Sequence, residues 1–198
     1  MRRLASLRPA ALAAVLAVAS ACADRPADDA PAAAAETQAP APAPSLATAT
    51  GLGVPNAHEP LPHLLTAGQV NQAQMEALAG AGYTRFISLR LPGEDGAGWE
   101  EAFATGQGLD FQRLAISGAA DLTRENVEAL DRILDAAVDA PTVLYCGSAN
   151  RVGAMLALRA HWLDGASAEE AMELGRAAGM TRLEPAVAQL LGVPAGTP

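Results

Sequence analysis

The sequence predicts a single α/β domain in which a central, mostly parallel sheet is flanked by helices. Strand-like and helix-like segments alternate from about residue 57 onward, and such alternation is typical of a parallel sheet covered on both faces. This part of the chain is about 140 residues long, the size of one domain. Before it lies an Ala/Pro-rich stretch with few large apolar side chains.

Three segments have the apolar composition expected of strands: residues 83–89, 111–116 and 142–145. In parallel sheets, ligands bind beyond the carboxyl ends of the strands. Cys146 directly follows the last of the three segments. We therefore expect the functional site at this end of the sheet.

Six segments have the spacing or the caps expected of helices, and they begin near Asn71, Trp99, Thr123, Val152, Ser167 and Glu184. In the helix that Thr123 caps, the apolar face is expected to hold Val127, Leu130, Leu134 and Ala137. Ser167 and Glu170 have the spacing of a capping box. Residues 152–163 are apolar around most of the helix, which predicts that this helix is central.

The N-terminal residues have the features of an export signal. Arginines at positions 2, 3 and 8 precede an apolar segment at 10–19, and residues 1–21 are too short for a stable membrane span. The following Val18-Ala-Ser-Ala-Cys22 resembles a bacterial lipobox, which implies cleavage before Cys22 and lipidation of its thiol. The alternative is cleavage after Ala21 or Ala23. We expect either a lipoprotein on the periplasmic face of a bacterial membrane or a soluble periplasmic protein.

Residues 22–56 are expected to form a lipidated, disordered tether, because a proline-rich sequence with little apolar surface cannot offset the cost of ordering. The folded domain is then expected at 57–198. This part contains nine arginines, no lysine and eighteen acidic residues. Such a charge argues against nucleic acid and anionic membrane surfaces as partners. Contact with a membrane is expected only through the lipid.

The most informative stretch is Val143-Leu-Tyr-Cys-Gly-Ser-Ala-Asn-Arg151, where an apolar strand, a tight turn and a helix follow one another. Free amides at a helix N-terminus bind anions and favour the thiolate form of a cysteine. We predict that Cys146 is the nucleophile and that Arg151 forks onto an anionic group. The amides of Gly147, Ser148, Ala149 and Asn150 would complete the site. The alternatives are a structural buried cysteine and a helix-surface arginine.

Three short motifs resemble the phosphatase-like family named after beta-lactamase-hydrolase-like proteins. They are Thr66-Ala-Gly-Gln69, Phe86-Ile-Ser-Leu-Arg90 with Glu94 close behind, and Cys146-Gly-Ser-Ala-Asn-Arg-Val-Gly-Ala154. The resemblance covers about residues 60–190 and implies a cysteine-phosphatase-like fold. Arg90 and Glu94 are expected either to support the site or to form a loop ion pair.

The same resemblance implies a general acid in the loop after the second predicted strand. Asp121 is the candidate there, whereas Asp110 and Asp95 are weaker ones. The alternative is that Asp121 only complements the dipole of the following helix.

The length of the loop separates two chemistries. Tyrosine phosphatases have five residues between cysteine and arginine, whereas this chain has four, the spacing found in rhodaneses, whose cysteine carries an extra sulfur atom. Tyr145 stands where phosphatases usually have histidine, and Val152 replaces a Ser or Thr. We therefore prefer a sulfurtransferase that takes sulfur from a small anionic sulfane-sulfur donor through a Cys146 persulfide.

Two alternatives remain open. The first is hydrolysis of a phosphomonoester through a phosphocysteine, with Asp121 as the acid. The second is a non-catalytic module that binds anions. No cofactor is expected, and no metal either, because His58, His63 and His161 lack the spacing of metal ligands.

Overall fold

The computed structural model describes residues 44–136 and 138–194. The expected signal segment 1–21, the lipidation site Cys22 and Ala137 lie outside the described residues. No helix within the described ranges is long and apolar enough to cross a membrane.

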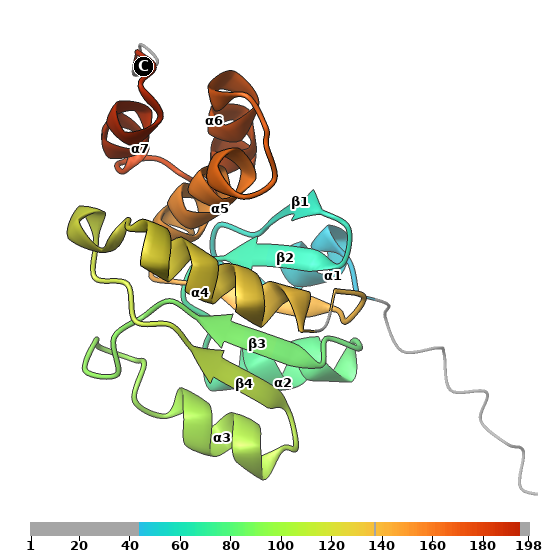
Figure 1. The fold of residues 1–198 in the computed structure, drawn as a ribbon. Helices are drawn as coiled ribbons and strands as arrows, with labels where there is room; N and C mark the ends of the chain where they lie inside the picture. Colours follow the sequence, from blue (N-terminus) through green and yellow to red (C-terminus); the bar gives the residue numbers. More distant parts are fainter. Residues whose placement is uncertain (1–43, 137, 195–198) are drawn as a thin grey trace, which may run out of the picture. The chain divides into compact units, whose positions relative to one another are not determined.

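Five strands form one sheet in the order β1-β2-β5-β3-β4 (Figure 1). The strands are β1 (His58–Leu61), β2 (Leu64–Ala67), β3 (Arg85–Ser88), β4 (Asp110–Arg113) and β5 (Thr142–Tyr145). Strands β2, β5, β3 and β4 run parallel, and β1 pairs antiparallel with β2 at the edge. The predicted mostly parallel sheet is confirmed, and the β1–β2 hairpin adds two strands that the sequence patterns did not indicate.

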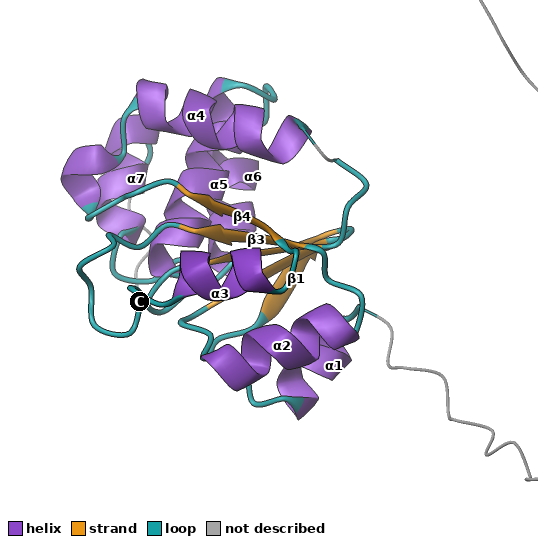
Figure 2. Ribbon diagram, turned by 90° about the horizontal axis from the view of Figure 1, so that it is seen from below, coloured by secondary structure: helices purple, strands orange, loops and turns teal. Residues whose placement is uncertain are grey.

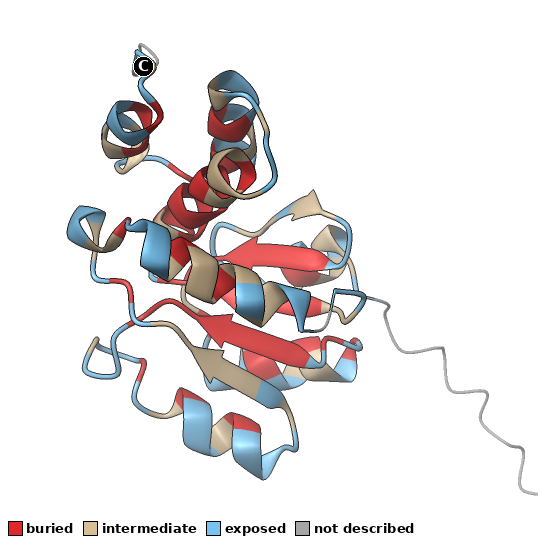
Figure 3. Cartoon of the chain, in the orientation of Figure 1, coloured by how far each residue is buried: buried red, intermediate tan, exposed pale blue. Residues whose placement is uncertain are grey.

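Helices cover both faces of this sheet (Figure 2). One face carries α1 (Leu46–Gly51), α2 (Gln72–Gly80) and α3 (Glu100–Gly106). The other carries α4 (Arg124–Asp135), α5 (Asn150–Trp162), α6 (Ala168–Ala177) and α7 (Glu184–Leu191). A short 3-10 helix, η1 (Ala119–Asp121), lies in the connection between β4 and α4. Burial is densest in β2, β3, β5 and α5 (Figure 3).

The alternation of side chains along β5 decides where the cysteine points. Val143 and Tyr145 pack with α1–α3, whereas Leu144 and Cys146 pack with α5 on the opposite face. Cys146 is therefore delivered to the face on which α5 begins.

The helix starts follow from side-chain caps. Asn71 caps α2 and Ser167 caps α6, each in a complete capping box, and Thr123 accepts a hydrogen bond from the backbone of Asn126 at the start of α4. Helix α5 begins two residues earlier than predicted, at Asn150. Arg151 consequently lies in its first turn.

The domain begins earlier than the predicted boundary at residue 57. Ser45 caps α1, and the side chains of Ala49 and Val54 are 0% and 6% exposed in the core beneath the sheet. Pro55 accepts a hydrogen bond from the backbone N–H of Gly68 at 2.7 Å. Residues 44–56 are thus part of the domain rather than of a tether. The sequence did not indicate this because the side chains that fill this part of the core, such as Ala49 and Val54, are small.

Two helical glycines let α6 pack directly on α5. A Cβ atom on Gly153 would lie 2.4 Å from the backbone of Gly175 and of Met180, and one on Gly175 would lie 2.9 Å from Ala157 Cβ. Real Cβ atoms do not approach neighbours so closely. This close packing brings the connection between α6 and α7 beside the start of α5.

Candidate active site

Cys146–Arg151, here called the cysteine loop, joins the end of β5 to the first turn of α5. Ala149 is the N-cap residue and has a left-handed backbone, φ 64°. The backbone N–H groups of Gly147, Ser148, Asn150 and Arg151 have no acceptor among the described residues. Such an array of free amides at a helix N-terminus is a site for an anion. The thiol of Cys146 is buried beside it, with 1% of its surface exposed.

The Arg151 side chain is held by Glu94. Nη1 and Nη2 donate to Glu94 Oε1 and Oε2 at 2.6 and 2.8 Å, and Nη1 also donates to the carbonyl of Ile116 at 2.7 Å. A guanidinium has five N–H groups, so Nε–H and one Nη2–H remain. These two face no oxygen acceptor within the described part of the chain. The Nε–H and Nη2–H of Arg151, here called its open fork, can therefore donate two parallel hydrogen bonds to a ligand.

Charge in this region is shared among two arginines and one carboxylate. Glu94 also accepts hydrogen bonds from Arg90 Nε at 3.0 Å and from the backbone of Leu91 at 2.8 Å. The hydrogen bonds from Arg151 are the main cause that lowers the pKa of Glu94 to about 2, although burial opposes the shift. The pKa of Arg151 is raised, first by Glu94 and further by the nearby Cys146 sulfur. The group keeps a net positive charge next to the thiol.

Asn150 acts through its side chain as well as its backbone. Its Oδ1 accepts hydrogen bonds from the backbone N–H of Thr181 and Leu183 at 2.8 and 3.1 Å, and from the Thr181 hydroxyl at 3.2 Å. Gly179 has a φ of 97°, and a Cβ there would lie 2.5 Å from Ala149 Cβ. Glycine is thus needed for the α6–α7 connection to lie against the cysteine loop.

No protein-family model matches the sequence, and no curated protein matches it either. Solved structures do. A DUF442 protein described as a candidate phosphatase, from Shewanella putrefaciens CN-32, is 21% identical, with a TM-score of 0.58 over 75% of this chain and 95% of its own. A candidate phosphatase from Neisseria meningitidis z2491 is 22% identical, with a TM-score of 0.55 over 67% of this chain and 94% of its own.

A third structure is TpbA from P. aeruginosa in complex with pTyr, which is 18% identical, with a TM-score of 0.57 over 80% of this chain and 94% of its own. The chain has a tyrosine-phosphatase-like fold. The resemblance found in the short motifs is confirmed at this level. At these identities the likeness establishes the fold.

Within this tyrosine-phosphatase-like fold, a buried polar network supports Arg90. Arg90 Nη1 donates to Gln69, whose Nε2 donates to Glu100 Oε1 at 2.9 Å. Glu100 is fully buried and also pairs with Arg113 Nη2 at 2.9 Å. Arg90 and Glu94 are thus both a loop ion pair and a support for the site. The sequence patterns did not indicate Glu100 or Arg113, because the contacts join separate elements.

Tyr145 does not take the place of a histidine beside the thiol. Its ring packs on the α1–α3 face, opposite Cys146, and its buried hydroxyl meets no hydrogen-bond partner with acceptable geometry within the described residues. Burial, followed by the negative charge of Glu100, raises the pKa of Tyr145 well above its usual value.

Asp121 lies in η1, where its carboxylate is bound by its own loop. Oδ2 accepts hydrogen bonds from the Ser117 backbone N–H at 2.6 Å and from the Ser117 hydroxyl. The Ser117 hydroxyl, followed by its backbone N–H, lowers the pKa of Asp121. Ser117 and Gly118 line the cleft above the cysteine loop, and the Asp121 side chain does not. The loop lies beside the cleft, but the Asp121 carboxylate is bound to Ser117 and does not line it.

The cleft above the cysteine loop is open, and charged side chains and apolar surface both line it. Besides the residues already described, it is lined by Leu91, Arg182 and Leu183. Nothing in the sequence indicated Arg182, because an exposed arginine in a helix connection has no local pattern. Its place follows from the Asn150 contacts.

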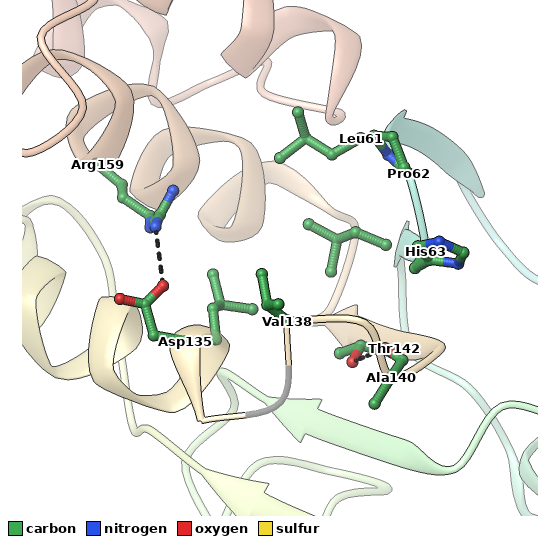
Figure 4. Close-up of a pocket in the computed structure, with 10 residues that line it drawn as sticks. Leu61, Pro62, His63, Asp135, Val138, Ala140, Thr142 and Arg159 are labelled. Carbon is green, nitrogen blue, oxygen red and sulfur yellow. Dashed lines mark hydrogen bonds and ion pairs between the residues drawn. The ribbon is translucent and has the colours of Figure 1, made fainter.

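A separate hollow lies at the other end of β5 (Figure 4). Apolar side chains such as Leu61 and Val138 line it, and Arg159 faces Asp135 at 3.3 Å on one side. Its lining residues include no cysteine and no helix N-terminus. The chemistry is therefore assigned to the cysteine loop. No group of three His, Cys, Asp or Glu side chains in the described ranges could hold a metal ion.

Proposed function

We propose that the chain is a cysteine-dependent phosphomonoester hydrolase that works through a phosphocysteine on Cys146. The observation that carries this proposal is the open Nε/Nη2 fork of Arg151, which lies beside the thiol and the free amides of the cysteine loop. A fork and several amides together can bind the equatorial oxygens of a phosphoryl group. The phosphatase-like structural neighbours support this reading over the preferred sulfur transfer.

In the first step, the Cys146 thiolate attacks phosphorus, a P–S bond forms, and the P–O bond to the leaving group breaks. The leaving oxygen takes up a proton. In the second step, water attacks phosphorus, the P–S bond breaks, and inorganic phosphate and the thiolate are released. Arg151 and the loop amides bind the phosphoryl oxygens throughout, and Glu94 is a positioning residue that fixes the guanidinium.

We keep Asp121 as the proposed general acid. Because its carboxylate is bound to Ser117, which lines the cleft, Asp121 must leave Ser117 to reach the leaving oxygen. Because hydrogen bonds from Ser117 lower the pKa of Asp121, its protonated form is scarce at neutral pH. The enzyme should therefore prefer aryl phosphates, whose leaving groups need little protonation. Asp121→Asn should slow alkyl phosphates more than aryl phosphates, whereas Asp95→Asn should change neither rate.

The test is hydrolysis of an aryl phosphate by the purified chain. Cys146→Ser should abolish turnover, and Arg151→Lys should lower kcat/KM about 100-fold or more, because a lysine cannot reproduce the planar fork. Arg132→Lys on α4, an exposed control, should have no effect. Absence of hydrolysis from the wild-type chain across aryl phosphates would overturn the proposal.

Sulfur transfer remains the second candidate because of one observation, the four residues between Cys146 and Arg151. A shorter loop offers fewer amides and suits a smaller group on sulfur. Incubation with thiosulfate should add one sulfur atom to Cys146 if this reading holds. A thiol that stays unmodified by thiosulfate while the chain hydrolyses aryl phosphates would remove it.

We also propose that the domain works outside the cytoplasm, held by a lipid on Cys22. The support is the signal-like N-terminus and the lipobox-like residues that follow it. Labelling with a radioactive fatty acid in a bacterial host tests this proposal. Label should enter the wild-type chain and be absent from Cys22→Ser.

A further inference from the structure

A second cleft adjoins the one above the cysteine loop. It is lined by Asn56 and His58 from the start of the domain and by the α6–α7 connection with Arg176 at its edge. Ser148 and Arg182 line both clefts. The two clefts are therefore neighbours, and a ligand bound at the cysteine loop can extend past Ser148 into the second one.

Arg182 is an uncompensated positive charge at this junction. Its exposed side chain has no ion pair or hydrogen bond among the described residues. Arg176, the other arginine of this cleft, is neutralised by Glu184, which accepts from Nε and Nη2 at 3.0 and 2.6 Å. The chain has a formal charge of −9, which repels anions. A guanidinium without an acidic partner beside an anion site offsets this repulsion locally.

The backbone of Arg182 is fixed on both sides. The N–H groups of Thr181 and Leu183 both donate to Asn150 Oδ1, so the residue between them is tied to the first turn of α5. The nearby Asn56 is tied to the same loop, since its Nδ2 donates to the Ser148 carbonyl at 3.5 Å. The backbone of Arg182 is therefore held beside the first turn of α5. Its side chain lines the same cleft as Arg151, so a ligand with two anionic groups can contact both arginines.

We propose that Arg182 and the second cleft bind a second anionic group of the substrate, so that the substrate is a small phosphomonoester with another phosphate or carboxylate. This inference rests on the proposed hydrolase function, whose cleft it extends. Arg182 supplies a charge-assisted hydrogen bond, and Asn56 and His58 offer polar groups beside it.

The experiment compares phenyl phosphate with the 1,2-, 1,3- and 1,4-benzene bisphosphates, which place a second phosphate at three fixed distances. At least one bisphosphate should have a kcat/KM about tenfold above that of phenyl phosphate, the size expected of one charge-assisted hydrogen bond. Arg182→Gln should reduce that ratio to about one. Arg132→Gln, which removes an exposed arginine that lines neither cleft, should leave the ratio at its wild-type value.

Binding is measured separately by calorimetry on the 198-residue chain carrying Cys146→Ser, which needs no turnover. The preferred bisphosphate should bind about tenfold more tightly than phenyl phosphate, and Arg182→Gln should remove the difference. If the chain shows this binding pattern but hydrolyses none of the compounds, the hydrolase proposal fails and the second subsite stands. Equal binding of all four compounds, or an equal loss for all of them in Arg182→Gln, would overturn the second subsite. A phenyl phosphate that carries a carboxylate at the ring position of the preferred second phosphate shows whether the second cleft favours a phosphate or a carboxylate.

Discussion

Glu94 sets the geometry of the Arg151 guanidinium at the residue scale. Removing its charge by Glu94→Gln should lower the free energy of unfolding by about 1–2 kcal/mol at neutral pH, because the pair is half-buried. It should also lower kcat/KM, since the fork loses its support. Glu128→Gln, which opens an exposed pair with Arg124, should cost no more than about 0.5 kcal/mol.

The loss of stability in Glu94→Gln should depend on pH, in a direction set by the pKa of Glu94. The folded-state pKa of Glu94 is about 2, below the ordinary 4.5, so its contribution is fully present above pH 4.5 and is lost as the pH falls toward 2. Unfolding curves of wild type and Glu94→Gln should converge over this window. A stability difference that stays constant from pH 6 to about 2.5 would contradict the assignment.

Tyr145 has a buried hydroxyl on the face of the sheet opposite Cys146. Because this buried group has no well-placed hydrogen-bond partner, Tyr145→Phe should leave the free energy of unfolding unchanged or raise it by about 1 kcal/mol. Thr66→Val is the control, since the buried Thr66 hydroxyl donates to the Ala178 carbonyl at 3.2 Å and its loss should cost about 1 kcal/mol. Denaturant titration of both variants checks the contrast, and a clear loss in Tyr145→Phe would count against it.

At the scale of elements, the contact between α5 and α6 depends on Gly153. Gly153→Ala should destabilise the domain by about 3 kcal/mol, because the added Cβ would meet rigid backbone at 2.4 Å. It should also weaken substrate binding by displacing the α6–α7 connection. Gly80→Ala, at the end of α2 with open space around it, should be neutral or stabilising by up to about 1 kcal/mol. Similar thermal stabilities of the two variants would refute this account of the packing.

The helices were largely predictable because their starts have local causes. Asn71, Thr123 and Ser167 are side-chain caps whose partners lie three residues away. The hairpin β1–β2 was not predictable from such signals. Its strands are four residues long, β1 contains Pro60, and β2 is stabilised by pairing with β5, far away in the sequence. The site residues divide in the same way. Cys146 and Arg151 share one loop and Glu94 belongs to a short motif, whereas Arg182 reaches the site only through tertiary contacts.

The whole domain includes the residues just before the first strand. A chain that starts at residue 44 should be as stable as the full chain, whereas one that starts at residue 57 should lose about 3–5 kcal/mol. The second truncation removes α1 with the buried Ala49 and Val54, and it breaks the contact of Asn56 with Ser148. Thermal unfolding of both truncated chains measures the difference. Equal melting temperatures would show that the domain does start at 57.

The central claim concerns the whole reaction, namely that Cys146 becomes phosphorylated. The most direct measurement is the intact mass of the chain after rapid acid quenching during turnover of an aryl phosphate. We predict a species heavier by one phosphoryl group, located on Cys146 and absent from Cys146→Ser. Turnover of the aryl phosphate without any phosphorylated species would contradict the account. So would a separate incubation with thiosulfate in which Cys146 gains sulfur, if no phosphorylated species is found with the aryl phosphate.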